Sequence, residues 1–248
     1  MAGSSGMCLK KPSKISFDHS FSRFIVSFFV VALLLFPGYG ETIEIEEAVF
    51  GLNQVRYLGG NQEARDKVAL TFDDAPNGAT KEILGILKEQ KVRATFFLIG
   101  SQVKKYPDIA QAIVRGGHEI GNHSYSHRLD ESFTLEDILD DLKRAEDIIR
   151  DVTGSLPAYF RPPRGFTNGE IKEACGRMGY TIVMWWVDSR DWQLGGQEIL
   201  DRVYSHLRPG GIVLLHSVPQ TVRILPQMIQ GLKERGYTLV TVSELLEG

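Results

Sequence analysis

The sequence contains two adjacent carboxylates and a pair of histidines whose types and spacing suit metal-dependent hydrolysis. Asp73 and Asp74 are neighbours, so their side chains diverge and can serve two tasks, one as a metal ligand and the other as a proton acceptor. His123 and His127 stand four residues apart, and on a helical turn both imidazoles would face the same ion. Two imidazoles and one carboxylate leave open coordination positions, as in catalytic zinc and non-haem iron sites. Each pair alone also has an ordinary explanation: a solvated turn ahead of Pro76, and surface or capping histidines.

A stiff, proline-containing loop offers an arginine and a main-chain donor. The segment at 161–165 reads RPPRG, and its prolines fix the backbone next to Arg161. A preorganised guanidinium is a natural partner for a carboxylate such as Asp73. Because prolines have no N–H, the first main-chain donor after them belongs to Arg164, which is therefore a candidate to stabilise an oxyanion. A rigid surface loop without a catalytic role is the competing interpretation.

A histidine and an aspartate further along the chain are candidates for an acid–base pair. His216 follows a short apolar run and precedes a loop, an unusual place for a core residue. Asp191 is a candidate to hold this imidazole and to tune it as a general acid. Trp192 stands beside Asp191 and is the best aromatic candidate to line a sugar-binding site, whereas core packing accounts equally well for Trp185 and Trp186.

These residues follow short strands that alternate with helices. Apolar, strand-like runs lie at 67–72, 94–99, 118–121, 159–160, 181–187, 212–215 and 238–241. Helical periodicity predicts helices over 79–90, 106–115, 134–152, 168–178, 197–206 and 222–235. The pattern predicts an α/β fold with a mainly parallel sheet, a single catalytic domain built as a distorted or incomplete (β/α) barrel of about seven strands. In such folds the loops after the strands gather on one face, where the polar residues that follow the strands are expected to meet.

The composition is that of an ordinary globular protein and argues against nucleic-acid binding. Hydrophobic residues make up 43% of the 248 residues and charged residues 24%, enough to build a core without disulfides. The formal net charge of -3 provides no broad basic surface for nucleic acid. No obligate protein partner is inferred. Cys8 and Cys175 lie on either side of an export segment, so no disulfide between them is expected.

The N-terminus resembles an export signal. Basic residues precede an uncharged apolar run at 24–36, and a Gly-Tyr-Gly segment at 38–40 provides small residues for cleavage. The run is shorter than the roughly 20 residues that span a bilayer, which favours a signal peptide, whereas the basic flank also suits a retained anchor. A buried core helix fits the terminal position less well. Either main interpretation places the protein outside the cytoplasm, secreted or anchored to the outer face of the cytoplasmic membrane. The expected division is a signal peptide or membrane anchor at 1–40, a linker or N-terminal extension at 41–65 and the catalytic domain at 66–248.

Five ordered motifs resemble those of the polysaccharide deacetylases, the NodB-homology domains of carbohydrate esterase family four. The motifs are TFDD at 71–74, HSYSH at 123–127, RPPRG at 161–165, DSRDW at 188–192 and LLHS at 214–217. The resemblance covers about residues 66–246 and is specific because all five motifs occur in order. It implies a distorted (β/α) barrel with one divalent metal ion, often zinc, for which cobalt, manganese or nickel can substitute.

The resemblance also assigns a role to each candidate residue. Asp73 resembles the catalytic base, oriented by Arg161, and Asp191 resembles the residue that tunes His216, the general acid. The implied mechanism is attack of a metal-bound water on the amide carbonyl, with Asp73 removing its proton and His216 protonating the leaving amine. The metal and the N–H of Arg164 would stabilise the oxyanion. The implied metal ligands are Asp74, His123 and His127. The residues expected to contact the substrate are Arg164, Trp192 and Leu214.

Two positions depart from the common motifs. Ala75 replaces the usual glycine after the two acids, and its methyl group could narrow the approach to them without abolishing function. Arg164 replaces the usual aromatic residue after the two prolines, which removes an aromatic wall and adds a positive charge. This charge favours a substrate that carries carboxylates, such as peptidoglycan with its lactyl and peptide groups. Members that deacetylate muramic acid residues resemble this form of the motif.

The sequence therefore predicts a metal-dependent hydrolase whose substrate is an acetylated glycan. The first expectation is removal of N-acetyl groups from N-acetylglucosamine or N-acetylmuramic acid of peptidoglycan. The five motifs do not separate this activity from deacetylation of chitooligosaccharides or from O-acetyl-xylan esterase activity. An exported, catalytically inactive carbohydrate-binding domain on the same scaffold is the alternative of another class. Against it stands the observation that every ligand, base and acid position is filled.

Overall fold

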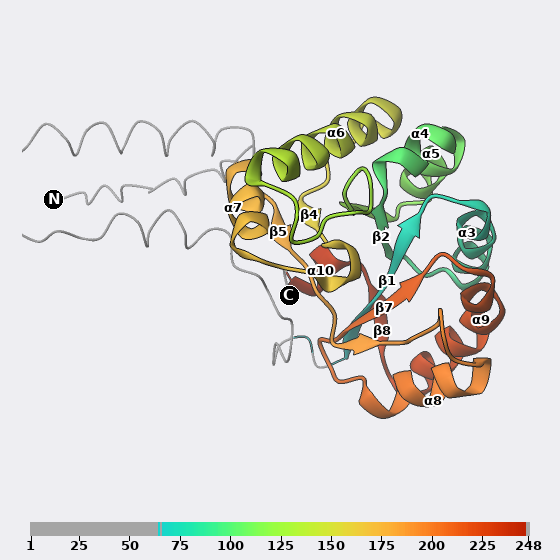
Figure 1. Ribbon diagram of the computed structural model, residues 1–248. Helices are drawn as coiled ribbons and strands as arrows, with labels where there is room; N and C mark the ends of the chain where they lie inside the picture. Colours follow the sequence, from blue (N-terminus) through green and yellow to red (C-terminus); the bar gives the residue numbers. More distant parts are fainter. Residues whose placement is uncertain (1–63, 65, 247–248) are drawn as a thin grey trace, which may run out of the picture. The chain divides into compact units, whose positions relative to one another are not determined.

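The computed structural model describes residues 64 and 66–246 and places helices around a single parallel sheet (Figure 1). Every strand pair in this sheet is parallel. Its strands are β1 (Lys67–Ala75), β2 (Thr95–Leu98), β3 (Glu119–Asn122), β4 (Tyr159–Phe160), β5 (Thr181–Ile182), β6 (Val187–Asp188), β7 (Ile212–His216) and β8 (Thr238–Val240). The helices are α3 (Gly78–Gln90), α4 (Gly100–Lys105), α5 (Pro107–Arg115), α6 (Leu135–Thr153), the short 3₁₀ helix η3 (Pro163–Gly165), α7 (Gly169–Met178), α8 (Gly196–His206), α9 (Pro219–Glu234) and α10 (Val242–Leu246).

The strand order makes the sheet an incomplete barrel, which confirms the expected fold class. The order is β5-β4-β3-β2-β1-β7-β6, and β8 pairs with the start of β1. Eight strands appear in place of about seven because the apolar run at 181–187 is two short strands, β5 and β6, at opposite ends of this order. Residues 183–186 cross between the two ends. The N–H of Val183 donates to Phe160 at the end of β4, and the N–H of Trp186 donates to Ile212 at the start of β7.

Side-chain caps and prolines determine where several helices begin. Thr134 and Asp137 form a reciprocal capping box at the start of α6, as their spacing predicts. Asn77 forms a capping box with Thr80 at the start of α3, and the side chain of Asn168 accepts the backbone N–H of Ile171 at the start of α7. Helix α9 begins at Pro219, earlier than expected, because proline is well tolerated in the first turn. The short helices α4 and α10, of six and five residues, were not expected because so few residues show no helical period.

The central strand is buried along almost its whole length and anchors the core. Val68, Leu70 and Phe72 of β1 are inaccessible to solvent and belong to one cluster with Ile83 of α3 and Leu225 of α9. Neighbouring strands pair with β1 in fixed register on both sides. Burial of this kind specifies register strongly, because a slip of one residue would exchange the apolar face of a strand for the other face. The carboxyl end of β1 is therefore held at a defined place in the sheet.

The proposed export segment at 1–40 lies outside the described residues, as does most of the linker at 41–65. Within the part of the chain that the structure describes, no helix combines the length and apolar character needed to cross a bilayer. Cys8 also lies outside this part. Cys175 is a buried free thiol on α7, and burial raises its pKa to about 12, so it is protonated and inert at neutral pH.

Candidate active site

The carboxyl ends of three parallel strands bring the candidate residues together. Asp73 and Asp74 lie within the last residues of β1, and not in the loop behind it as expected. In the ladder between β1 and β7, Asp73 is directly opposite His216. Strand β3 ends at Asn122, immediately before His123. Because all these strands run in the same direction, their polar ends meet on one face, as the fold class predicts.

Asp74, His123 and His127 form a site whose geometry fits a divalent cation. One ligand atom from each residue lies within 4.8 Å of the others. Oδ1 of Asp74 is 3.7 Å from Nε2 of His123 and 3.2 Å from Nε2 of His127, and it is buried without a hydrogen-bond partner. A buried carboxylate oxygen between two imidazoles is normally satisfied, and a cation would satisfy it. Burial, together with the charge of His123, lowers the pKa of His127, which favours the neutral imidazole that binds metals.

The loop that carries the two histidines is not the helical turn that their spacing suggested. Ser124 and His127 have positive φ angles of 67° and 57°, which are incompatible with a helix. The N–H of Ser124 donates to the side chain of Asn122, and the N–H of His127 donates to Oγ of Ser124. Side-chain acceptors thus replace the carbonyls of a helix. The two rings still lie side by side, with centroids 5.0 Å apart. The turn therefore brings the two imidazoles together as a helix would, although its backbone is not helical.

Arg161 is completely buried and binds the carboxylate of Asp73. Its Nη1 donates to Oδ1 of Asp73 at 2.8 Å and to Oγ1 of Thr71 at 2.7 Å. Its Nε and Nη2 donate to the carbonyl oxygens of Val183 and Met184, at 3.1 and 3.0 Å. These carbonyls belong to the segment that crosses between the two ends of the sheet. One guanidinium therefore both binds the carboxylate and occupies groups that a closed barrel would pair with another strand.

The surroundings of Asp73 keep its carboxylate charged. Burial would raise the pKa of Asp73, but the charge of Arg161, followed by His123 and His216, outweighs burial and holds the pKa below its usual value. Oδ1 of Asp73 is bound to Arg161, whereas Oδ2 lies 3.7 Å from Nε2 of His123. Oδ2 is therefore the oxygen placed to accept a proton beside the cation site.

Asp191 holds His216 through both its ring and its backbone. Oδ1 of Asp191 is 2.7 Å from Nδ1 of His216, and Oδ2 accepts the His216 backbone N–H at 2.7 Å. Thr221 of α9 donates its hydroxyl to the same carboxylate. Burial would lower the pKa of His216, but the hydrogen bond and charge of Asp191 outweigh burial and raise the pKa to about 9. The imidazole is therefore protonated at neutral pH, and Nε2 is the nitrogen available to donate a proton.

Replacing Asp191 with Asn is expected to move the alkaline limit of activity to lower pH. Asp191→Asn removes the negative charge that stabilises the imidazolium, so the pKa of His216 falls and the protonated acid is lost about 1–3 pH units earlier. The pH dependence of kcat/KM measures this limit. If the alkaline limb stayed in place in a variant whose circular dichroism matched the parent, His216 would not be the general acid.

A cavity of about 410 Å³ connects these groups. It is lined by all three residues expected to contact a substrate, Arg164, Trp192 and Leu214. Trp192 is 63% exposed, so much of its indole is accessible to a molecule that enters the cavity. Arg164 is exposed at the rim. The proposed metal ligands, base and acid also line the cavity: Asp74, His123, His127, Asp73 and His216.

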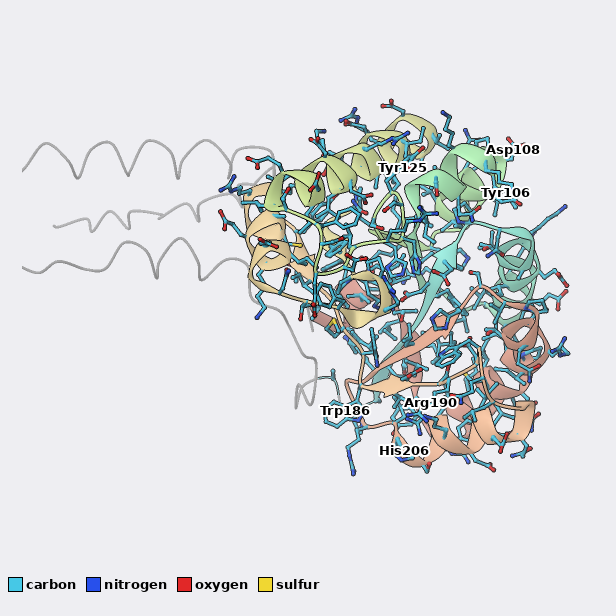
Figure 2. The ribbon with its side chains drawn as sticks, in the orientation of Figure 1. Tyr106, Asp108, Tyr125, Trp186, Arg190 and His206 are labelled. Atoms are coloured by element: carbon cyan, nitrogen blue, oxygen red, sulfur yellow. The ribbon has the colours of Figure 1, made fainter. Side chains whose placement is uncertain are left out.

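Trp185, Asp188 and Gly165 also line the cavity, although none of them was predicted to contact the substrate. A β-carbon at Gly165 would lie 2.7 Å from the ring of Trp185, so the absence of a side chain allows their close approach. Trp186 does not line the cavity. It is 45% exposed and donates its indole N–H to the carbonyl of His206 (Figure 2). Two adjacent tryptophans differ because the crossing segment turns one ring inward and leaves the other outside.

Ala75 does not narrow the approach to the two acids. It is completely buried in the core cluster and does not line the cavity. Strand β1 continues through Ala75, whose carbonyl accepts the N–H of Ile99. The expectation was wrong because Asp74 has a positive φ of 62° and the register between β1 and β2 shifts at this point, which together turn the methyl group into the core.

The chain is similar to several known proteins. A family model described as polysaccharide deacetylase matches residues 60–183. The peptidoglycan-N-acetylmuramic acid deacetylase PdaC of Bacillus subtilis is 38% identical over 73% of this chain but only 38% of its own length. A peptidoglycan-N-acetylglucosamine deacetylase of Bacillus cereus is 39% identical over 72% of this chain and 87% of its own. Among solved structures, a pseudoenzyme of the same esterase family from Bacillus anthracis has a TM-score of 0.70 and 36% identity, covering 73% of this chain and 66% of that one.

Proposed function

The chain belongs to the polysaccharide deacetylase family, and from this membership we propose that it removes N-acetyl groups from the glycan of peptidoglycan. The observation that carries the proposal is that an ionised Asp73 and a protonated His216 line the same cavity as a three-residue cation site. Hydrolysis of an amide needs a base for the attacking water and an acid for the amine that leaves. The names of the two peptidoglycan deacetylases support this choice of substrate.

We propose that Asp74, His123 and His127 hold one divalent cation. Zinc is the first choice, since two imidazoles and one carboxylate with open positions suit it, and cobalt, manganese or nickel can replace it. When bound, such an ion supplies Lewis-acid activation of the water and of the amide carbonyl. The chain itself orients the ligands: the carbonyl oxygen of Arg161 lies 2.6 Å from Nδ1 of His123, so a hydrogen bond donated there leaves Nε2 free for the cation.

In this proposal two protons move through defined atoms of the chain. Oδ2 of Asp73 accepts a proton from the attacking water, while Arg161 keeps Oδ1 occupied. Nε2 of His216 donates a proton to the amine nitrogen as the carbon–nitrogen bond breaks, while Asp191 holds Nδ1. The N–H of Arg164 is the proposed main-chain donor to the oxyanion. Trp192 and Leu214, on the cavity wall, are the proposed contacts to the sugar.

Acetate release tests the function directly. We expect the zinc-loaded protein to release acetate from purified peptidoglycan, a chelator to abolish release, and added zinc to restore it. Mass spectrometry of the digested glycan identifies whether glucosamine or muramic acid has lost its acetyl group. Faster release from chitooligosaccharides or acetylated xylan would favour those alternatives. If the protein bound glycan but released no acetate with any metal, it would be an inactive carbohydrate-binding domain. Inactive proteins occur on this scaffold, since one structural relative is a pseudoenzyme.

Arg164→Tyr is expected to shift preference away from acidic substrates. Arg164 is exposed at the rim of the cavity and also borders a neighbouring hollow next to Phe166. Loss of an exposed charge facing a substrate carboxylate should reduce the ratio of kcat/KM on peptidoglycan to kcat/KM on neutral chitooligosaccharides about two- to fivefold. The difference should shrink as salt is added, because exposed charges are screened. A ratio equal to that of the parent would exclude selection by this charge.

We also propose that the chain acts outside the cytoplasmic membrane, with residues 66–248 as its catalytic domain. The basic flank and apolar run before residue 40, together with the location of peptidoglycan, support this placement. The mass of the protein in membrane and medium fractions distinguishes a cleaved signal peptide from a retained anchor. Full-length protein in the cytoplasmic fraction alone would contradict the placement.

A further inference from the structure

The loop that carries the two metal-binding histidines has a strained backbone that other groups must hold. We call residues 122–127 the histidine loop. Two of its non-glycine residues, Ser124 and His127, occupy the left-handed region. Such conformations cost free energy and persist where the surrounding structure determines them. The loop itself supplies two of the required hydrogen bonds, from the side chains of Asn122 and Ser124.

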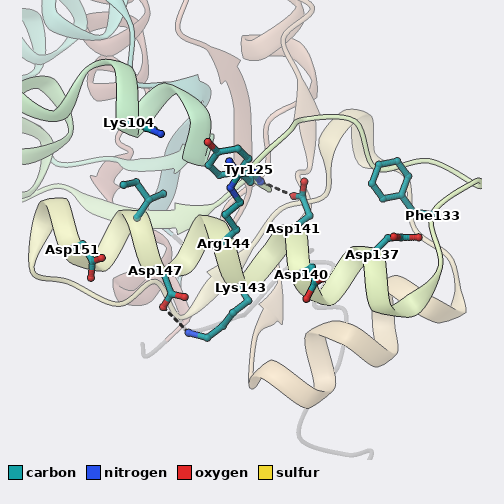
Figure 3. Close-up of a pocket in the computed structure, with 11 residues that line it drawn as sticks. Lys104, Tyr125, Phe133, Asp137, Asp140, Asp141, Lys143, Arg144, Asp147 and Asp151 are labelled. Atoms are coloured by element: carbon teal, nitrogen blue, oxygen red, sulfur yellow. Dashed lines mark hydrogen bonds and ion pairs between the residues drawn. The ribbon is translucent and has the colours of Figure 1, made fainter.

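The other two N–H groups of the turn are held from outside the loop by a single carboxylate. Oδ1 of Asp141 accepts the N–H of Tyr125 at 2.6 Å, and Oδ2 accepts the N–H of Ser126 at 3.1 Å. Figure 3 shows Asp141 reaching from α6 toward Tyr125. Hydrogen bonds to a charged acceptor are about twice as strong as neutral ones. Asp141 thus binds the two residues midway between His123 and His127, and it does so from a rigid helix.

Close packing around Tyr125 holds the histidine loop in addition to the hydrogen bonds to Asp141. The guanidinium of Arg144, one turn further along α6, lies 3.7 Å from the centroid of the Tyr125 ring. Gly100 also lies close to Tyr125: a β-carbon at Gly100 would be 2.8 Å from this ring and 2.9 Å from Ala145 of α6, so glycine is needed for the approach. The N–H of Gly100 donates to the carbonyl of Ser124. The histidine loop is therefore clamped between α4 and α6.

We propose that Asp141 is a positioning residue for the cation site: it holds the histidine loop so that both imidazoles reach Asp74. Nε2 of His127 lies 3.2 Å from Oδ1 of Asp74, a separation that depends on the path of residues 124–127. Without Asp141, two N–H groups of this path lose their acceptors, and the loop can relax away from the left-handed conformation at His127. The proposal rests on the proposed function only in requiring that the site bind a cation.

Zinc affinity of Asp141 variants tests this role without any measurement of activity. Asp141→Ala removes both acceptors, and Asp141→Asn keeps one carbonyl oxygen that can accept one N–H. Asp140→Ala is the matched control, because Asp140 is the preceding residue of α6, exposed, and makes no hydrogen bond or ion pair within the described residues. We expect the Kd for Zn²⁺, measured by competition with a chromophoric chelator, to rise about 10–100-fold in Asp141→Ala. The rise should be smaller in Asp141→Asn and absent in Asp140→Ala.

Thermal unfolding with and without Zn²⁺ separates positioning from a general loss of stability. A merely structural role would lower the Tm of the metal-free and zinc-loaded forms equally. Positioning predicts that the increase in Tm on adding zinc becomes smaller, since stabilisation by a ligand follows its affinity. Equal zinc affinity in parent and both Asp141 variants would overturn the inference and leave the proposed function standing. If Asp141→Ala does not fold, the Zn²⁺ affinity of Asp141→Asn decides the question. If the parent protein binds no zinc, both this inference and the proposed function are wrong.

Discussion

Asp73→Asn is expected to lower kcat about 10²–10⁴-fold while leaving zinc affinity nearly unchanged, because general-base catalysis contributes that factor. The asparagine has almost the same shape and keeps an oxygen that can accept the hydrogen bond from Arg161, but its amide cannot take a proton from water. Oδ2 of Asp73, the oxygen affected, lies 3.7 Å from Nε2 of His123 and is not among the three ligand atoms grouped for a cation. Acetate release from peptidoglycan and Zn²⁺ titration measure the two quantities on the same preparation.

The neighbouring residue provides the matched control. Asp74→Asn makes the same chemical change one position further along β1, at a proposed ligand. It should weaken zinc binding, and part of its activity should return at high zinc concentration, which Asp73→Asn cannot show. If both variants lost zinc affinity to the same extent, the division between base and ligand would be incorrect. If Asp73→Asn kept the kcat of the parent, another group would have to accept the proton.

Arg161→Met is expected to destabilise the metal-free protein by about 3–5 kcal/mol at neutral pH, since removing one partner of a buried ion pair leaves the other charge uncompensated. The guanidinium is completely buried and makes hydrogen bonds to Asp73, Thr71, Val183 and Met184. Methionine fills much of the volume of the arginine side chain but donates no hydrogen bond to these four residues. Urea unfolding in the presence of a chelator measures the loss, and activity should fall as Asp73 becomes harder to ionise.

The pH dependence of this loss identifies its cause. In the parent the pKa of folded Asp73 lies below its unfolded value, so its contribution to stability is present above about pH 4 and is lost as the pH falls through the folded pKa. In Arg161→Met the largest charge that opposes burial is gone and only His123 and His216 remain, so the folded pKa of Asp73 rises and ionised Asp73 contributes less stability at neutral pH. The difference between the two proteins should therefore be largest at neutral pH and shrink toward about pH 4.

Arg161→Lys separates the charge from the hydrogen bonds. A lysine keeps Asp73 ionised but cannot reach all four acceptors with one ammonium group. We expect it to lose less stability than Arg161→Met and to show little of the pH-dependent difference. A loss that was the same at every pH in Arg161→Met would show that packing, and not the charge on Asp73, explains the cost.

The parts of the site that follow from local motifs could be predicted from the sequence. Asp73, Asp74 and His216 stand at the ends of apolar strands, and the alternation of strands and helices is enough to bring such ends together. The positions of His123 and His127 were predictable but their backbone was not, because side chains of Asn122 and other residues compete with helical hydrogen bonds.

Contacts between distant segments could not be read from patterns. Asp141 lies on an amphipathic helix rich in acids, and nothing in its immediate sequence distinguishes it from Asp140. The apolar run at 181–187 predicts one buried strand. A run that pairs in one strand ladder and a run that crosses between two ladders have the same apolar sequence, so the sequence does not distinguish them. The hydrogen bonds from Arg161 to the carbonyl oxygens of residues 183 and 184 hold the crossing, and with it the different surroundings of Trp185 and Trp186.

The same crossing leaves each end of the strand order with a strand of only two residues, β5 at one end and β6 at the other, and β8, which pairs with β1 alone, has three. Another chain can extend a sheet by pairing with the free N–H and C=O groups of an edge strand, and long flat edge strands offer the most of these groups. A two-residue strand offers very few. The segment that shapes the cavity thus also limits the main-chain groups available for pairing at these two ends of the sheet.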